Sequence, residues 1–249
     1  MQVLIVGAGA MGRWLADGVG GDVAFADADP AAAEAAATEI GGRAVALDAE
    51  EQFETVVIAV PMDAAVDAIA AHATKATGAI VDLAGVMAGP TEAMATHAPD
   101  LERASLHPLF APGNAPGRIA IVAENEGVVL RAIREDLASR GNTFVETTPE
   151  EHDRAMETVQ ASTHAAVLAF GLAAEPVPDG FGTPVYDALE ELRAEITGGT
   201  PRVYADIQST FDGAEAVAEA ATRIADADAD AFEQLYREAG GDADSRPDE

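Results

Sequence analysis

Residues 3–12 read VLIVGAGAMG, an apolar run followed by glycines at positions 7, 9 and 12. An apolar strand that leads through such glycines into a helix is typical of proteins that bind a dinucleotide. Gly7 permits the tight turn after the strand, Gly9 lets the backbone approach a pyrophosphate, and Gly12 allows the helix to pack closely. The positive end of that helix then faces the phosphates.

A second apolar strand, residues 22–26, ends at Asp27, 20 positions after Gly7. A carboxylate at that distance accepts hydrogen bonds from both adenosine ribose hydroxyls and repels a 2′-phosphate. The strand, the helix and the acid together favour a dinucleotide site over a glycine turn that serves packing alone, and they predict NAD rather than NADP. Asp29 is the alternative ribose partner, because sequence patterns locate a strand end only to within about two residues.

The charge of the chain is strongly negative. Its 249 residues include 44 acids and 14 bases, which gives a net charge of −30, and Lys75 is the only lysine. Such a surface repels nucleic acid and anionic membranes, so neither is an expected partner. In about 1 M salt, charges are screened beyond roughly 3 Å. We therefore interpret the composition as halophilic adaptation, with an acidic protein of an ordinary cytosol as the alternative.

The chain contains no cysteine. Disulfides, zinc–thiolate sites and a thiol nucleophile are thereby excluded, and we expect no metal site. No apolar run approaches the ~20 residues that a membrane span needs, and the first residues form a strand rather than a secretory signal. These features predict a soluble, cytoplasmic protein.

Strand and helix patterns alternate as far as residue 146, which predicts parallel strands joined by crossover helices. After Pro149 the strand patterns stop, and helices are expected over residues 149–174, 184–197, 201–211 and 213–238. The predicted fold class is α/β, with a Rossmann-like, doubly wound, mostly parallel sheet followed by an all-helical domain. We expect the NAD-binding domain to span residues 1–147 and the helical domain to span residues 148–249.

Ligands of doubly wound sheets sit beyond the carboxyl ends of the strands, where several candidate residues fall. His107 ends one such strand, and a histidine titrates near neutral pH. It can therefore take a proton from a substrate hydroxyl while hydride leaves the same carbon. The residues expected to contact the cofactor are Gly7, Gly9, Met11, Gly12, Asp27, Val60, Pro61 and Gly85.

The helix expected at 149–174 carries a polar stripe. At ~100° per residue its members share one face, and they are Asp153, Glu157, Gln160 and His164. Apolar residues follow His164, which implies that this imidazole is buried and is either hydrogen-bonded or functional. A lone histidine on an apolar helix is more often structural, but a second histidine facing the same cleft as His107 favours function. For His152, at the helix start, capping and catalysis remain equal alternatives.

Three stretches carry a more specific resemblance. They are Leu106-His107-Pro108-Leu109-Phe110-Ala111-Pro112, then Glu151-His152-Asp153 with Gln160 and His164, then Leu189 through Tyr204-Ala205-Asp206-Ile207. In this order and spacing, they resemble the prephenate dehydrogenase family. The match covers nearly the whole chain up to about residue 212.

The resemblance implies an oxidoreductase of aromatic amino acid biosynthesis that uses NAD to convert prephenate into 4-hydroxyphenylpyruvate, a step toward tyrosine. By this resemblance, His107 deprotonates the ring C4 hydroxyl as hydride passes to nicotinamide. His164 positions the substrate with Gln160 beside it, and Tyr204 lines the pocket. The helical domain is then expected to bind substrate and to form a homodimer.

The chain departs from the family pattern at two places. Gly85-Val86-Met87 stands where the family usually has Ser-Val-Lys, and Glu195 falls where a carboxylate-binding arginine is expected. Because a carboxylate cannot clamp a carboxylate, Arg193 and Arg202 are the candidate replacements. Arogenate as the substrate, or a non-catalytic NAD-binding regulator, therefore remain alternatives. A 3-hydroxyacid dehydrogenase is disfavoured, because the helical domain contains no lysine.

Overall fold

The computed structural model describes residues 1–178 and 180–241, which form two compact units. The first unit is Met1–Ala155 and the second begins at Met156. The division falls inside helix α6 (Pro149–Met156), a few residues beyond the boundary at residue 147 expected from the strand pattern. The reason is that the side chains of His152 and Asp153, on α6, bond to residues earlier in the first unit.

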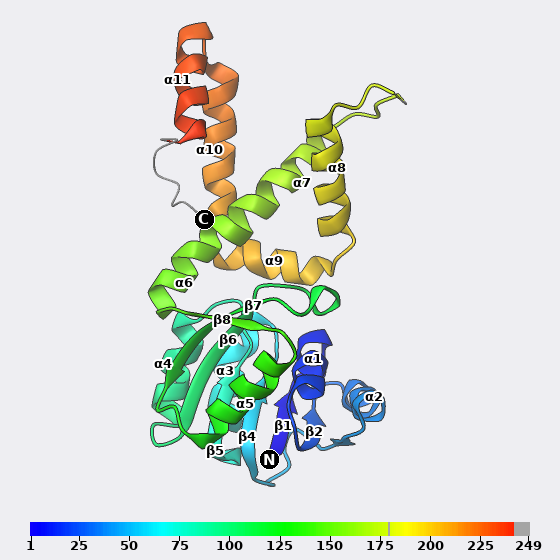
Figure 1. Ribbon diagram of the computed structural model, residues 1–249, viewed down its shortest axis with the longest axis vertical. Coiled ribbons are helices and arrows are strands. Elements are labelled where there is room, and N and C mark those ends of the chain that lie inside the picture. The colour runs from blue at the N-terminus through cyan, green and yellow to red at the C-terminus, as the bar shows by residue number, and fades with distance from the viewer. Residues whose placement is uncertain (179, 242–249) are drawn as a thin grey trace. The chain divides into compact units, whose positions relative to one another are not determined.

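The first unit is built on an eight-stranded sheet in the order β3-β2-β1-β4-β5-β6-β7-β8 (Figure 1). The strands are β1 (Gln2–Val6), β2 (Asp22–Ala26), β3 (Arg43–Ala44), β4 (Phe53–Ile58), β5 (Ala76–Asp82), β6 (Glu102–Pro108), β7 (Arg118–Glu124) and β8 (Thr143–Glu146). Every neighbouring pair is parallel except β6 and β7. This confirms the predicted α/β class. The short edge strand β3 has no counterpart in the sequence patterns.

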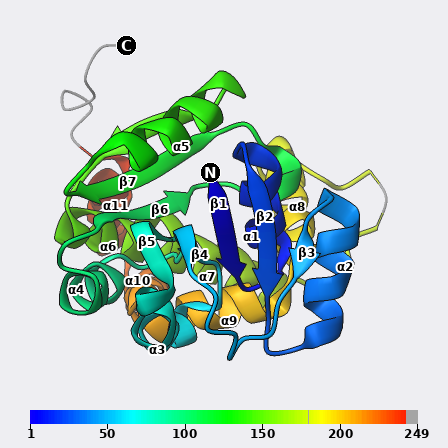
Figure 2. The same cartoon turned by 90° about the horizontal axis from the view of Figure 1, so that it is seen from below.

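Helices cover both faces of this sheet. They are α1 (Ala10–Gly18), α2 (Pro30–Ile40), α3 (Ala65–His72), α4 (Ala88–His97) and α5 (Val128–Ser139). One buried cluster joins the sheet to α1, α2 and α5, and a second joins its other face to α3 and α4. Figure 2 shows α5 and α3 on opposite faces of the strands. Because the central strands are buried on both faces, they are continuously apolar rather than alternating.

The second unit is helical. Its elements are a π-helical segment (Glu157–Ser162), α7 (Thr163–Ala173), α8 (Pro184–Thr197), α9 (Pro201–Thr210), α10 (Gly213–Asp226) and α11 (Ala229–Gly240). The expected continuous helix over 213–238 is wrong. Ala227 is extended, and the side chain of Asp228 accepts a hydrogen bond from the Ala231 amide to begin α11.

The single α-helix expected over 149–174 is also wrong, because the π-helical segment interrupts it. A π turn bonds residues five apart, so it changes which side chains share a face. Within the described ranges, no helix is long and apolar enough to cross a membrane.

Candidate functional site

The glycine turn after β1 is shaped by backbone contacts. Gly7 has a φ of +102°, and a Cβ there would lie 2.3 Å from the carbonyl oxygen of Ala59. A Cβ on Gly12 would lie 2.2 Å from the carbonyl oxygen of Gly7. Both positions therefore require glycine for the turn itself and for the approach of α1 to it.

Gly9 differs from these two glycines. A Cβ at Gly9 would meet no described atom within 4 Å, so packing does not demand glycine there. Gly9 is the N-cap residue of α1, which has no side-chain cap and no acidic residue in its first turn. The exposed amide groups of this helix end fit a bound phosphate. Met11, in the same turn, is half-buried and packs against the core.

Asp27 follows β2 at the carboxyl edge of the sheet. Its Oδ2 accepts a 2.7 Å hydrogen bond from the Ala8 amide in the glycine turn, and its Oδ1 accepts a 2.9 Å bond from the Asp29 amide. Asp29 instead caps α2, because its Oδ1 accepts from the Ala31 amide at 3.0 Å. A pocket between the start of α2 and the segment that contains β3 is lined by Asp27, Ala28, Pro30, Ala33, Glu34 and residues 44–48. Asp27, which lines the pocket, is thus the better placed of the two acids.

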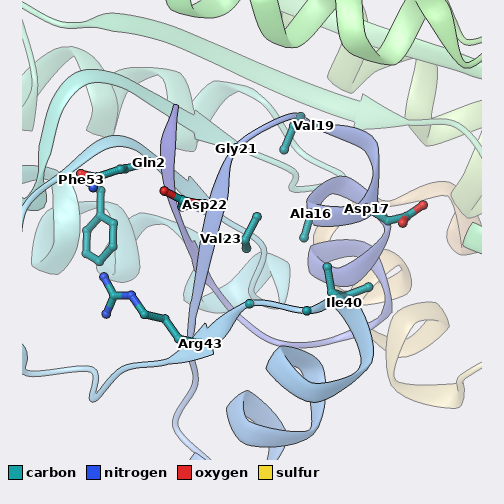
Figure 3. A pocket seen from close by; sticks show the side chains of 12 residues that line it. Gln2, Ala16, Asp17, Val19, Gly21, Asp22, Val23, Ile40, Arg43 and Phe53 are labelled. Atoms are coloured by element: carbon teal, nitrogen blue, oxygen red, sulfur yellow. The ribbon is translucent and has the colours of Figure 1, made fainter.

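A second pocket lies at the opposite edge of the sheet. Figure 3 shows its lining, which includes Gln2, Asp22 and Arg43. Gln2 and Asp22 begin β1 and β2, so this pocket opens at the amino ends of the strands. Doubly wound sheets bind their ligands at the carboxyl ends. We assign no role to it.

Gly85 and His107 come together at the carboxyl edge. A Cβ on Gly85 would lie 3.6 Å from Nε2 of His107 and 2.9 Å from Sδ of Met62. Val60 and Pro61 precede Met62 in the chain. Val60 is half-buried, and Pro61 is the N-cap residue of the short 3-10 helix that begins at Met62. A side chain at position 85 would therefore contact both Met62 and the imidazole of His107.

His107 is 7% exposed and is hydrogen-bonded to a second histidine. Its Nδ1 lies 2.8 Å from Nε2 of His152, and Nδ1 of His152 lies 2.8 Å from Oδ1 of Asp153. Asp153 in turn accepts hydrogen bonds from the backbone amides of Met87 and Ala88 at 2.8 and 3.0 Å. Met87 itself is fully buried, so its side chain serves the core. This chain of contacts was not predicted from the sequence. The adjacent histidine and aspartate in the Glu151-His152-Asp153 motif were the signal that could have indicated it.

The electrostatics of this region follow from burial. Burial, and then the neighbouring His152, lower the pKa of His107 to about 3, while Asp153 acts in the opposite direction. The imidazole is therefore neutral at pH 7 and able to accept a proton. Burial raises the pKa of Asp82, at the end of β5, to about 7, and the Ala84 amide partly offsets this effect.

The second unit brings His164 and Tyr204 together. Their rings meet edge to face with centroids 4.9 Å apart, and both are half-buried. Burial lowers the pKa of His164, and no described residue hydrogen-bonds its Nδ1. Burial, followed by the Glu195 carboxylate, raises the pKa of Tyr204. Gln160 lies on the π-helical segment, four residues before His164.

The two candidate arginines both form ion pairs along their own helices. Arg193 contacts Glu190 at 2.6 Å, and Arg202 contacts Asp206 at 2.6 Å. Along the expected polar stripe, Asp153 bonds to amides of the first unit and Glu157 is exposed. Gln160 and His164 belong to the second unit. The stripe is thus not continuous, because the π-helical segment separates its two ends.

Comparisons with known proteins identify the family. The family model described as prephenate dehydrogenase, nucleotide-binding domain, matches residues 12–130. A 4-amino-4-deoxyprephenate dehydrogenase of Streptomyces pristinaespiralis is 35% identical over 245 aligned residues, covering 89% of this chain and 81% of that protein.

Solved structures share the fold. Prephenate dehydrogenase from A. aeolicus, in complex with hydroxyphenyl propionate and NAD+, superposes with a TM-score of 0.71 at 16% identity, covering 97% of this chain and 92% of that chain. Synechocystis arogenate dehydrogenase gives a TM-score of 0.57 at 16% identity, covering 98% of this chain and 99% of that chain. At these identities the likeness concerns the fold alone.

Proposed function

Because the chain belongs to the prephenate dehydrogenase family, we propose that it catalyses the NAD-dependent oxidative decarboxylation of prephenate to 4-hydroxyphenylpyruvate. The observation that carries the proposal is the position of His107. This neutral imidazole ends β6 beside Gly85, at the edge of the sheet that also holds the glycine turn and Asp27. A base and a dinucleotide turn at one edge suit the removal of a proton and a hydride from one carbon.

The residues of the first unit have distinct proposed roles. The glycine turn and the start of α1 hold the pyrophosphate, and Asp27 holds the adenosine ribose. When bound, NAD accepts the hydride from C4 of the substrate. His107 takes the proton of the C4 hydroxyl, which leaves a carbonyl at C4. Loss of carbon dioxide then makes the ring aromatic, and the proton returns to the phenolate oxygen.

The residues of the second unit are proposed to bind the substrate. We assign His164 and Gln160 to its polar groups and Tyr204 to the wall of its pocket. Arg193 and Arg202 are the candidate partners of a substrate carboxylate, and either must exchange a helical ion pair for that contact. Ion pairs between side chains exposed to solvent contribute little to stability, so this exchange is not prohibitive.

A substrate that carries an amino group is the second candidate. Glu195 lies close enough to Tyr204 to raise the pKa of its hydroxyl, and it stands where the family's arginine is expected. A carboxylate there suits an ammonium group better than a second carboxylate. Arogenate, which has an amino group where prephenate has a keto group, is such a substrate. In 4-amino-4-deoxyprephenate the amino group instead replaces the C4 hydroxyl, so the name of that relative concerns the reacting carbon and not the group near Glu195.

The test is NADH formation at 340 nm in multi-molar potassium chloride. Prephenate, arogenate and 4-amino-4-deoxyprephenate are offered separately, each with NAD and with NADP. Turnover of prephenate with NAD supports the first proposal, whereas turnover confined to an amino substrate supports the second. Folded protein that binds NADH but turns over none of the three would instead be a non-catalytic regulator.

We further propose that the enzyme is a cytoplasmic, salt-adapted homodimer that associates through its helical unit. The net charge of −30 supports the salt adaptation. Exposed apolar side chains of the helical unit support the dimer, among them Leu172, Val185 and Tyr236. Light scattering in high salt tests the dimer, and a monomeric mass would refute it. Unfolding on dilution of the salt, followed by refolding when salt is restored, tests the adaptation.

A further inference from the structure

Two polar residues of the first unit, His152 and Asp153, have no place in the mechanism above. His152 is 3% exposed and lies 45 positions from His107 in the sequence, yet the two rings are hydrogen-bonded. Burial removes an imidazole from water, so its nitrogens need partners inside the protein. His152 finds them in His107 and Asp153, and it thereby connects the proposed base to a carboxylate.

The direction of the hydrogen bonds can be followed from Asp153. Two backbone amides at the start of α4 donate to its carboxylate, one to each oxygen. Burial alone would raise the pKa of Asp153, but the hydrogen bonds from His152 and these amides lower it overall. The side chain is therefore an ionised carboxylate at neutral pH, which only accepts hydrogen bonds. Nδ1 of His152 must be the donor across the 2.8 Å contact with Oδ1.

This donor fixes the protonation of both rings. In the neutral form of His152, which the inference requires, the ring carries one N–H, so Nε2 is an acceptor once Nδ1 donates. The partner at 2.8 Å, Nδ1 of His107, must then be protonated. The lone pair of His107 is left on Nε2, the ring atom that lies nearest to Gly85.

We infer that Asp153 and His152 are positioning residues, which hold His107 in the tautomer whose Nε2 can accept the substrate proton. The inference rests on the proposed role of His107 as the base. The C4 hydroxyl proton moves to Nε2, so His107 briefly carries a proton on each nitrogen. The carboxylate of Asp153, reached through His152, stabilises this imidazolium, much as the orienting acid does in a catalytic triad.

Nitrogen-15 NMR of the histidine rings tests the tautomer directly, in the intact protein and without turnover. The chain has five histidines, and the His107 signals are those that disappear in His107→Asn. We expect a protonated Nδ1 and an unprotonated Nε2 at neutral pH. A ring protonated on Nε2, or on both nitrogens, overturns the inference even if the enzyme turns over prephenate. Conversely, the expected spectrum in a protein without activity would count against the proposed function and not against the tautomer.

Two variants at position 152 distinguish a role of His152 in positioning His107 from a role in packing alone. His152→Phe fills the space but offers no acceptor, so His107 should adopt the Nε2–H tautomer and kcat should fall at least about tenfold with KM for NAD unchanged. His152→Gln retains an acceptor oxygen and should recover the native tautomer and most of kcat. His97→Gln, at an exposed histidine of the same unit, is the control and should match the parent. Equal loss of kcat in the Phe and Gln variants, with the tautomer unchanged, contradicts the inference.

Asp153→Asn provides the test if His152→Phe fails to fold. The amide has nearly the shape of the carboxylate but lacks its charge, so it no longer imposes one direction on the hydrogen bonds. We expect mixed tautomers at His107 and a loss of kcat at constant KM for NAD. An unchanged spectrum and an unchanged kcat would overturn the role of Asp153.

Discussion

The two units of the molecule each contain a ring pair, and the pairs differ in how completely their polar atoms are satisfied. In the first unit, His107 and His152 are 7% and 3% exposed and are joined to Asp153 by hydrogen bonds. In the second, His164 and Tyr204 are half-buried and meet through their ring edges. No described residue hydrogen-bonds Nδ1 of His164.

This difference separates two kinds of functional residue. A buried chain of hydrogen bonds fixes the geometry of its members before any ligand binds. A partly buried ring with an unsatisfied nitrogen is instead completed by a ligand or by water. We therefore expect substitutions at the first pair to change the rate of the chemistry and substitutions at the second to change substrate affinity.

The largest effect is expected at His107. His107→Asn should lower turnover by at least about a hundredfold, the usual scale of general base catalysis, because Asn cannot accept the proton. The affinity for NAD should stay the same, since the glycine turn and Asp27 are untouched. Initial rates at 340 nm and a fluorescence titration with NADH measure the two quantities. Near-parental turnover would make His107 structural and would remove the contrast between the pairs.

The pH dependence of stability at Asp82 tests whether water reaches the buried interior of the first unit. Because its folded pKa is raised to about 7 from an ordinary 3.8, the protonated form stabilises the fold below pH 3.8, and this contribution is lost as the pH rises through 7. Asp82→Asn should therefore be more stable than the parent by about 4 kcal/mol at pH 9, with little difference near pH 4. Denaturant unfolding at the two pH values measures the change. A parent that is as stable at pH 9 as the variant would mean that water reaches this carboxyl.

The acids after β2 provide the next test, within the first unit. Asp27→Ser should weaken NAD binding by about tenfold and allow NADP to bind, since the ribose loses its acceptor and the 2′-phosphate loses its repulsion. Asp29→Ser is the matched control, because serine also caps helices well and should leave both affinities unchanged. Cofactor titrations of the two variants distinguish the acids. A larger loss in Asp29→Ser would transfer the ribose contact to Asp29.

The smallest effects are expected in the second unit. His164→Asn should raise KM for the substrate by about fivefold with little change in kcat, since it removes one hydrogen bond worth about 1 kcal/mol. Tyr204→Phe keeps the ring contact and should change KM less. Steady-state kinetics at saturating NAD separates KM from kcat. A fall in kcat comparable to that of His107→Asn would show that the second pair also affects the rate of the chemistry, contrary to the proposed difference between the pairs.

Much of the first unit could be predicted because its determinants are local. Strand β1, the glycine turn and helix α1 follow one another within a few residues, and each has its own composition or period. The helices of the second unit were predicted except at the π-helical segment Glu157–Ser162 and at Asp228. Asp228 divides α10 from α11 although the alanine-rich pattern continues across it, because one capping side chain outweighs a weak helix propensity.

The sequence by itself determined the parallel sheet, the dinucleotide turn with Asp27, and His107 as the candidate base, since these depend on spacing along the chain. Only the tertiary structure shows that His152, for which capping and catalysis were equal alternatives, is hydrogen-bonded to His107. The hydrogen bond between His107 and His152 joins residues 45 positions apart, and no period in the sequence records such a contact. Likewise, the π-helical segment Glu157–Ser162 lies between Asp153 and His164, and the three- and four-residue spacing of the sequence predicted an ordinary α-helix there.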